Sequence, residues 1–116
     1  MSSFWAYWGK ARPAEGSSAA FHLLPYHCLD VAAVGAAYLA AAPGLSRWLC
    51  KELGIAPEDH LVMWVSFWLA LHDLGKFSEG FQGQRADLFK QLRGRAPSKP
   101  YNERHDTLGK AVWTKL

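Results

Sequence analysis

The sequence predicts an all-α fold. Apolar residues recur at helical spacing in several segments, Pro and Gly residues interrupt them where helices would end, and no segment shows a convincing strand pattern. Half of the 116 residues are hydrophobic and 14% are aromatic, which favours a real core over disorder. The length indicates one small domain, or part of one.

The first 20 residues begin with aromatic side chains and continue rich in Gly, Pro, Ser and Ala. We expect an irregular arm whose Trp5, Tyr7 and Trp8 dock onto a helical body spanning residues 21–116. A first helix follows, and it ends before Pro43-Gly44. Its predicted inner face comprises His27, Val31, Val34 and Tyr38.

A second helix is expected over residues 45–53, with Gly54 just past its end. The third begins at Pro57, carries two acids in its first turn, and runs to about Leu74 before Gly75 ends it. Because apolar residues cover most of its sides, we expect it to be the central buried helix. The same reasoning predicts that four aromatic residues belong to the core: Trp64, Phe67, Trp68 and Trp113.

The C-terminal third is more broken. We expect a turn or broken helix over residues 77–84, a short helix over 87–92, and a loop over 94–104. A last helix begins near His105. Its predicted inner face comprises Leu108, Val112 and Leu116.

The run Leu71-His72-Asp73-Leu74-Gly75-Lys76 is the most informative feature of the chain. An adjacent His and Asp can offer one imidazole nitrogen and one carboxylate oxygen to the same metal ion, and Lys76 can bring a cation close to a bound phosphate. A His-Asp dipeptide alone is a weak signal, since a core histidine with a satisfied hydrogen bond is then the favoured explanation of His72. The glycine and lysine in register favour metal-assisted hydrolysis of a phosphate ester.

His27 and His105 lie near the starts of other predicted helices. Three imidazoles and the Asp73 carboxylate could therefore converge on one ion, and this donor set suits Fe, Mn, Co, Ni or Zn better than Ca. Asp106 is better explained as a helix-start acid than as a ligand. His22 and His60 are interpreted as surface or boundary residues.

Basic residues gather late in the chain, where no acid occurs between Asp87 and Glu103. Such a segment could track the phosphates of a single-stranded nucleic acid, with Phe89 and Tyr101 available for stacking, or it could be a solvated loop without a partner. The net charge of +3 permits a nucleic-acid partner without indicating one. The candidate residues are Arg85, Lys90, Arg93, Arg95, Lys99 and Arg104.

Compartment signals are few. Cys28 and Cys50 show no CxxC spacing and are expected to be buried or half-buried thiols in a reducing cytosol. The N-terminus does not look like a signal peptide, and the longest apolar run, residues 61–71, is too short to span a bilayer. We therefore expect a cytoplasmic protein with no membrane partner.

Two longer segments resemble a known family. The residues His22-Leu-Leu-Pro-Tyr-His27-Cys-Leu-Asp-Val-Ala-Ala-Val34 and Ala70-Leu-His-Asp-Leu-Gly-Lys-Phe77 are similar to the N-terminal HD nuclease domain of the CRISPR-associated helicase–nuclease of type I systems. Tyr7-Trp8-Gly9-Lys10 and Glu103-Arg-His105-Asp-Thr-Leu-Gly109 fit the same template. The resemblance implies an HD-superfamily helical fold, a site for one or two metal ions, and metal-dependent cleavage of single-stranded DNA that a guide-RNA surveillance complex exposes.

The resemblance also implies roles for individual residues. His27, His72 and His105 match metal-binding histidines, Asp73 matches the bridging ligand, and Lys76 matches the lysine of the motif. Asp73 and Lys76 are thus the catalytic candidates. Helicase domains would follow in the family and feed the strand to the nuclease.

The chain departs from the template at its C-terminal side. Family members carry a further adjacent pair of histidines and a later aspartate, which this sequence does not contain. We therefore expect an HD domain incomplete at the C-terminus, weak or inactive alone, with uncovered apolar faces that would favour dimerisation. Two alternatives stay open: an HD-type phosphohydrolase of nucleotides, and a non-catalytic interaction module derived from the nuclease.

Overall fold

The computed structural model describes residues 3–12, 16 and 18–115, which fall into two compact units. One unit joins the N-terminal residues up to His27 with everything from His72 onward, and the other is the helical segment Cys28–Leu71. Predicted arm positions 1–2, 13–15 and 17, and the predicted inner-face residue Leu116, lie outside the described residues. The fold is mostly α-helical, as predicted.

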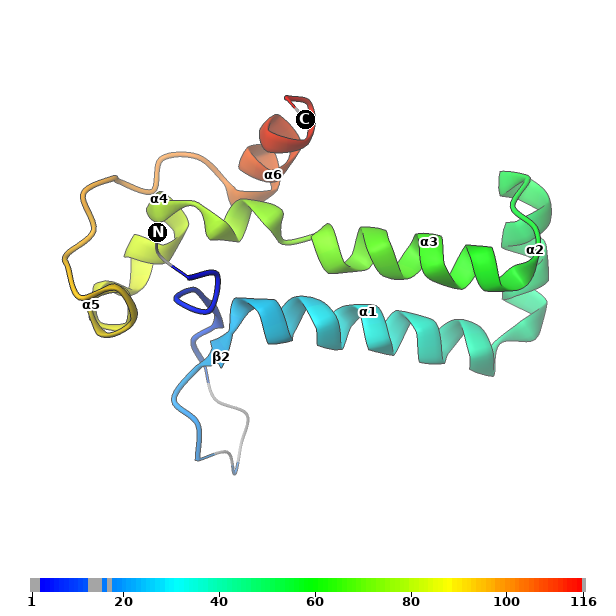
Figure 1. Cartoon of the computed structure of the whole chain (residues 1–116), viewed down its shortest axis with the longest axis horizontal. Coiled ribbons are helices and arrows are strands. Elements are labelled where there is room, and N and C mark those ends of the chain that lie inside the picture. Colours follow the sequence, from blue (N-terminus) through cyan, green and yellow to red (C-terminus); the bar gives the residue numbers. More distant parts are fainter. Residues whose placement is uncertain (1–2, 13–15, 17, 116) are drawn as a thin grey trace. The chain divides into compact units, whose positions relative to one another are not determined.

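A small antiparallel sheet opens the first unit (Figure 1). Strand β1 (Trp8–Lys10) pairs with β2 (His22–Leu23), with Trp8 opposite Leu23 and Lys10 opposite His22. The expectation of no strand, and of an arm irregular throughout, is therefore wrong. Strands of two or three residues are too short to show a period of two, and the burial of Trp8 against Phe81 and Leu88 depends on residues distant in sequence.

The rest of the first unit consists of short elements. They are a 3₁₀ turn η1 (Leu74–Phe77), α4 (Glu79–Gln82), a 3₁₀ turn η2 (Gly83–Arg85), α5 (Ala86–Arg93) and α6 (His105–Trp113). This order confirms the predicted broken helix, short helix, loop and last helix. Helix α4 begins with a side-chain cap, in which the Phe81 N–H donates to the Ser78 hydroxyl.

The core of the first unit forms around the docked N-terminal arm. Trp8, Phe81 and Leu88 are buried together, and the Trp8 and Phe81 rings lie 4.9 Å apart. Tyr7 meets the edge of Phe77 at 4.9 Å. The predicted docking of the arm is thus confirmed for Tyr7 and Trp8, and it ties the start of the chain to the segment that follows His72.

The second unit is built from long regular helices: the part of α1 (Leu24–Ala41) that follows His27, α2 (Pro43–Leu53) and α3 (Glu58–Leu71). In Figure 1, α1 (blue to cyan) runs alongside α3 (green). Gly54 adopts a left-handed conformation, with φ of 65°, and ends α2 as predicted. Helix α3 ends at Leu71, three residues earlier than predicted, and Gly75 lies within η1 instead of ending the helix.

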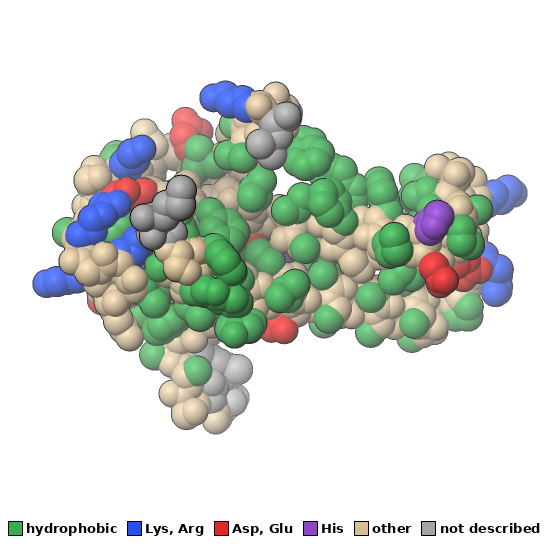
Figure 2. Space-filling model, in the orientation of Figure 1, with side chains coloured by type: hydrophobic (Ala, Val, Ile, Leu, Met, Phe, Trp, Pro, Cys, Tyr) green, Lys and Arg blue, Asp and Glu red, His purple; other side chains and the backbone are tan. Residues whose placement is uncertain are grey.

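Burial within these long helices differs from the prediction. Val34 and Tyr38 are 69% and 63% exposed, and Trp64 on α3 is 47% exposed. Leu61 is the one buried residue of α3, so the prediction of a central buried helix with an aromatic core is wrong. Helical periodicity identifies an apolar face but does not determine what covers it. Figure 2 shows the resulting hydrophobic side chains spread over α1 and α3.

Two composition-based expectations bear on compartment. Cys28 is buried and Cys50 half-buried, and both are thiols, as expected. Helix α1 has 18 residues and a mean hydropathy of 1.2, so by length and composition alone it could cross a bilayer. A single helix of this kind is weak evidence for a membrane span, because core helices satisfy the same criteria.

Candidate metal centre

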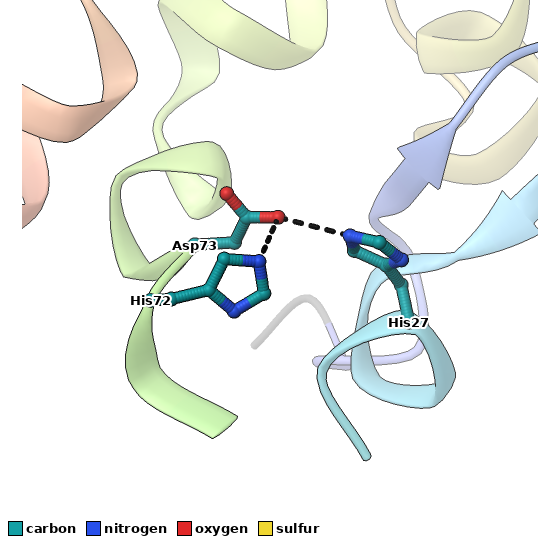
Figure 3. A group of neighbouring side chains, drawn as sticks. All are labelled: His27, His72 and Asp73. Atoms are coloured by element: carbon teal, nitrogen blue, oxygen red, sulfur yellow. Dashed lines mark hydrogen bonds and ion pairs between the residues drawn. The ribbon is translucent and has the colours of Figure 1, made fainter. Parts of the chain in front are cut away.

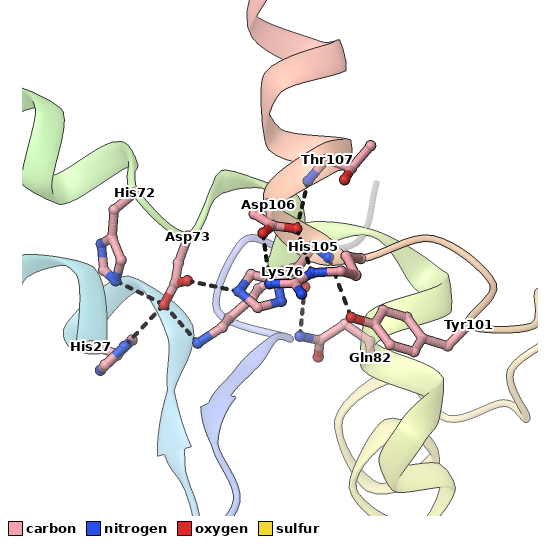
Figure 4. Close-up of polar contacts among 10 residues, drawn as sticks. His27, His72, Asp73, Lys76, Gln82, Tyr101, His105, Asp106 and Thr107 are labelled. Atoms are coloured by element: carbon pink, nitrogen blue, oxygen red, sulfur yellow. Dashed lines mark hydrogen bonds and ion pairs between the residues drawn. The ribbon is translucent and has the colours of Figure 1, made fainter.

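The carboxylate of Asp73 lies at the centre of the candidate site. Asp73 directly precedes η1 and is only 3% exposed. One of its oxygens, Oδ2, lies 3.0 Å from His27 Nε2, 3.0 Å from His72 Nε2 and 2.7 Å from Lys76 Nζ (Figures 3 and 4). A buried carboxylate needs such partners, because an isolated buried charge is costly.

His27 reaches this carboxylate from the N-terminal part of the chain. It lies in the first turn of α1, which continues directly from β2. The Leu24 N–H donates to the Tyr7 carbonyl at 2.8 Å, so the sheet and the helix start are joined to the docked arm. The aromatic arm therefore positions a candidate ligand 46 residues away in sequence from Asp73.

Lys76 is held one 3₁₀ turn after Asp73. Its ammonium donates to Asp73 Oδ2, its side chain is 15% exposed, and it lies 5.6 Å from the centroid of the Phe81 ring. The Gln82 side-chain amide donates to the Lys76 carbonyl at 2.9 Å. Lys76 thus compensates the buried charge of Asp73 and is fixed on both its backbone and its side chain.

His105 approaches the other carboxylate oxygen, with Nε2 3.6 Å from Asp73 Oδ1 (Figure 4). It is the first residue of α6, and its N–H donates to the Tyr101 hydroxyl at 3.3 Å. A Cβ atom at Gly75 would overlap the His105 carbonyl. The glycine of the motif therefore allows α6 to approach η1 closely enough to bring His105 to the site.

The environment favours a neutral His27. Burial lowers the pKa of the His27 imidazole from its usual value, and the nearby Lys76 cation lowers it further, whereas Asp73 acts in the opposite direction. A lowered pKa keeps the ring neutral at pH 7. Neutral imidazole is the form that binds metal ions.

The donor set fits a divalent transition metal. His27, His72 and Asp73 each offer a ligand atom, and these atoms all lie within 4.8 Å of one another. Bonds of about 2.0–2.2 Å from one ion would separate neighbouring ligand atoms by roughly 3–3.5 Å, close to the 3.0 Å separations between each imidazole and Asp73. Mixed imidazole and carboxylate ligation suits Fe, Mn, Co, Ni or Zn.

The predicted basic track is largely engaged within the chain. Arg85 pairs with Asp87 at 2.6 Å, Arg95 with Glu79 at 2.8 Å, and Arg104 with Asp106 at 2.9 Å. Arg93 lies 3.9 Å from the centroid of the Tyr7 ring and donates to the Ala6 carbonyl. Of the six predicted residues, Lys90 and Lys99 are the two exposed cations with no ion pair in the described part of the chain.

The aromatic residues proposed to assist that track differ in access. Phe89 is 1% exposed and cannot stack on a base, whereas Tyr101 is 38% exposed. Asp106 accepts a hydrogen bond from the Thr107 N–H, which agrees with its predicted helix-start role. His60 is exposed, as predicted.

Sequence reasoning missed two residues near the site. Gln82 is 1% exposed, and its side chain bonds the backbone of Trp8 at both N–H and carbonyl as well as the Lys76 carbonyl. His22, interpreted as a boundary residue, has its ring 6.3 Å from that of His27. Gln82 has no local sequence signal, because its partner Trp8 lies 74 residues away in the sequence.

Taken together, a mostly helical fold with a His-Asp pair and additional histidines around a buried carboxylate defines an HD-type domain with a candidate metal centre. The family model described as "Cas3, HD domain" matches residues 8–116, and this chain belongs to that family. No solved structure gives a significant match.

Two curated relatives agree with this assignment. The "CRISPR-associated endonuclease/helicase Cas3" of Escherichia coli (strain K12) is 36% identical over 92 residues, which cover 79% of this chain and 10% of that protein. The protein of the same name from Thermus thermophilus is 34% identical over 96 residues, covering 83% of this chain and 10% of the relative. The chain thus spans about a tenth of the length of these relatives.

Proposed function

We propose that this chain is a metal-dependent nuclease domain that cleaves single-stranded DNA in type I CRISPR interference. The observation that carries the proposal is the convergence of His27 and His72 on the buried carboxylate of Asp73. Membership of the Cas3 HD family supports nuclease chemistry over other uses of such a centre. The preference for single-stranded over double-stranded DNA is proposed from the family resemblance.

His27, His72 and Asp73 would hold the metal ion, and His105 lies at the second oxygen of the same carboxylate. Fe, Mn, Co and Ni are preferred over Zn in this proposal, with one or two ions in a full domain. When bound, such an ion lowers the pKa of a coordinated water molecule and stabilises charge on a phosphoryl oxygen.

Lys76 has two roles in this proposal. Its ammonium balances the charge of Asp73, so the carboxylate does not repel an approaching phosphodiester. With His27 held neutral, the site then carries excess positive charge once a divalent ion is present. Lys76 remains within one turn of the reacting group and can stabilise the phosphate as negative charge develops.

The partners follow from the family. The relatives are named as CRISPR-associated endonuclease and helicase, which supports a helicase that delivers the strand. From the family resemblance we propose that a guide-RNA surveillance complex exposes that strand. We propose a cytoplasmic location for this system. The exposed apolar side chains of α1 and α3 would also permit dimerisation.

The test is a cleavage assay with the 116-residue chain. A labelled single-stranded oligonucleotide is incubated with Mn²⁺, Co²⁺ or Ni²⁺, and with a chelator in parallel. We expect metal-dependent cleavage that is slow and at least about 100-fold reduced by Asp73→Asn, which keeps the side-chain volume but removes the charged ligand. Asp59→Asn, an exposed acid in the first turn of α3, is the matched control.

Assays with small phosphate esters distinguish the nuclease from the two alternative functions. Hydrolysis of nucleotides or cyclic dinucleotides without cleavage of DNA would replace the nuclease by a small-molecule phosphohydrolase. A folded chain that binds metal but cleaves neither class of substrate would contradict catalysis by this chain and leave a non-catalytic interaction module.

A further inference from the structure

We propose that four aromatic side chains form a stacking surface for the bases of a single-stranded nucleic acid, leading to the Asp73 centre. This aromatic track consists of Phe4, Trp5, His22 and Tyr26. The inference rests on the proposed function for its class of ligand. It assigns substrate binding to the N-terminal arm and to the start of α1 after β2, whereas the sequence offered the basic loop either as a phosphate track or as a solvated loop without a partner.

The rings of the track follow one another without a gap. Phe4 lies 4.5 Å from Trp5, Trp5 lies 5.1 Å from Tyr26, and the Tyr26 and His22 rings are stacked at 6.3 Å. Figure 1 shows the N-terminal turn (dark blue) beside the start of α1. These separations fall in the range at which aromatic rings interact.

The track continues into the candidate metal centre. The His22 ring lies 6.3 Å from that of His27, and the His27 ring lies 5.7 Å from that of His72 (Figure 3). A strand whose bases stack on the track would therefore place its next phosphate close to Asp73. This continuity distinguishes the track from the exposed aromatic residues of α3, which lie in the other unit.

The outer rings of the track remain accessible. Phe4, Trp5 and Tyr26 are 56%, 42% and 49% exposed, although Tyr7 and Trp8 of the same arm pack inward. Contiguous exposed aromatic surface of this kind is typical of a binding site. Stacking on aromatic rings is the usual way in which proteins hold single-stranded bases without regard to sequence.

The charge of the N-terminal segment that carries Phe4 and Trp5 is suited to a nucleic acid. Lys10 and Arg12 are exposed, and the segment 3–12 contains no acid. Lys10 lies opposite His22 in the sheet. Most of the basic loop, in contrast, is neutralised by pairs such as Arg95 with Glu79. The arm therefore offers both rings and cations, as a single-strand binding surface requires.

The experiment measures binding without catalysis. A labelled oligothymidine of about 12 nucleotides is titrated with the 116-residue chain in a chelator, so that no metal supports cleavage. We expect Trp5→Ala to weaken binding about tenfold, consistent with loss of one stacked base. Trp5→Phe, which keeps a ring, should recover most of the affinity, and the slope of affinity against salt should not change in either variant because no cation is lost.

A matched control and a second variant complete the test. Trp64→Ala removes a tryptophan of similar exposure, 47%, from the other unit and should bind as the original chain does. Tyr26→Ala should weaken binding as Trp5→Ala does. Unchanged affinity in both track variants, or no binding by the original chain, would overturn the track.

The two proposals fail separately. Metal-dependent cleavage together with unchanged affinity in the track variants would remove the track and keep the nuclease. Track-dependent binding without cleavage under any metal would keep the track and remove the nuclease.

Discussion

The two units of this molecule differ in how the regularity of the backbone relates to the burial of side chains. The segment Cys28–Leu71 consists of long regular helices, yet it exposes large residues such as Met63 and Trp68 at 65% and 38%. The unit with the candidate site has short, irregular elements, yet it buries the polar residues Asp73 and Gln82 with their partners. A regular backbone therefore does not identify the region with the most specific interactions. Buried polar side chains that have hydrogen-bond or ion-pair partners identify it.

Truncating one aromatic side chain in each unit tests this difference between the units most directly. Phe89→Ala, at a residue 1% exposed in the first unit, should lower the free energy of unfolding by about 3–5 kcal/mol because it leaves a cavity. Trp64→Ala in the second unit should change it by only about 0.5 kcal/mol, since the ring is 47% exposed. Urea denaturation of both variants measures the difference, and similar losses would contradict the contrast.

Gly75→Ala tests the close approach of α6 to η1. The new methyl group would overlap the His105 carbonyl, so α6 must move away. We expect a loss of about 3 kcal/mol in unfolding free energy and weaker metal binding. Gly44→Ala is the control, because a Cβ there meets no atom within 4 Å. Equal stability of the two variants would show that the motif glycine has no steric role.

Gln82→Met tests the buried amide that joins the arm to Lys76. The substitution keeps the volume but removes three hydrogen bonds to the backbones of Trp8 and Lys76. We expect a loss of roughly 2–3 kcal/mol in thermal or urea unfolding, because buried backbone groups lose their partners. Gln84→Met, at an exposed position, should have little effect. An unchanged unfolding free energy in Gln82→Met would mean that water molecules replace the hydrogen bonds of the amide without loss of stability.

The smallest effect is expected from Glu79, a half-buried carboxylate that pairs with the exposed Arg95. A hydrogen bond from Arg95, with further bonds from Ser98, holds the pKa of Glu79 well below its usual value of 4.5. A lowered carboxylate pKa stabilises the fold above that usual value, and the stabilisation is lost as pH falls below it. The difference in urea midpoint between the original chain and Glu79→Gln should therefore shrink as pH is lowered from 6 toward 3. If the difference in urea midpoint does not depend on pH, the Glu79 side chain stabilises the fold through packing and not through its charge.

The sequence predicted the positions of the helices better than it predicted which of their side chains are buried. Most helix boundaries could be predicted because Pro57, Gly54 and Gly94 begin or end helices through their own backbone conformations. The exposure of Trp64 and Tyr38 depends instead on what packs against each helix, which no local pattern contains. The two short strands were missed for the same reason, since their partners are distant in sequence.

The candidate site shows the same division. The run from His72 to Lys76 indicated a metal-binding function because the residue types themselves limit the chemistry. The structure brings His27 to this run, with His105 at the edge of the site, and their roles as ligands stay predictions. Gln82 and the aromatic track could not be predicted, because their function depends on contacts that only folding of the arm creates.

Metal binding by the 116-residue chain tests the central claim most directly. Calorimetric titration with Mn²⁺, Co²⁺ and Ni²⁺ should show one ion bound per chain, and His27→Ala should weaken binding by at least about tenfold without loss of helical circular dichroism. His60→Ala, which changes an exposed histidine outside the site, should bind as the original chain does. Absence of binding in a folded sample, or equal affinity in the His27 and His60 variants, would contradict a metal centre built on Asp73.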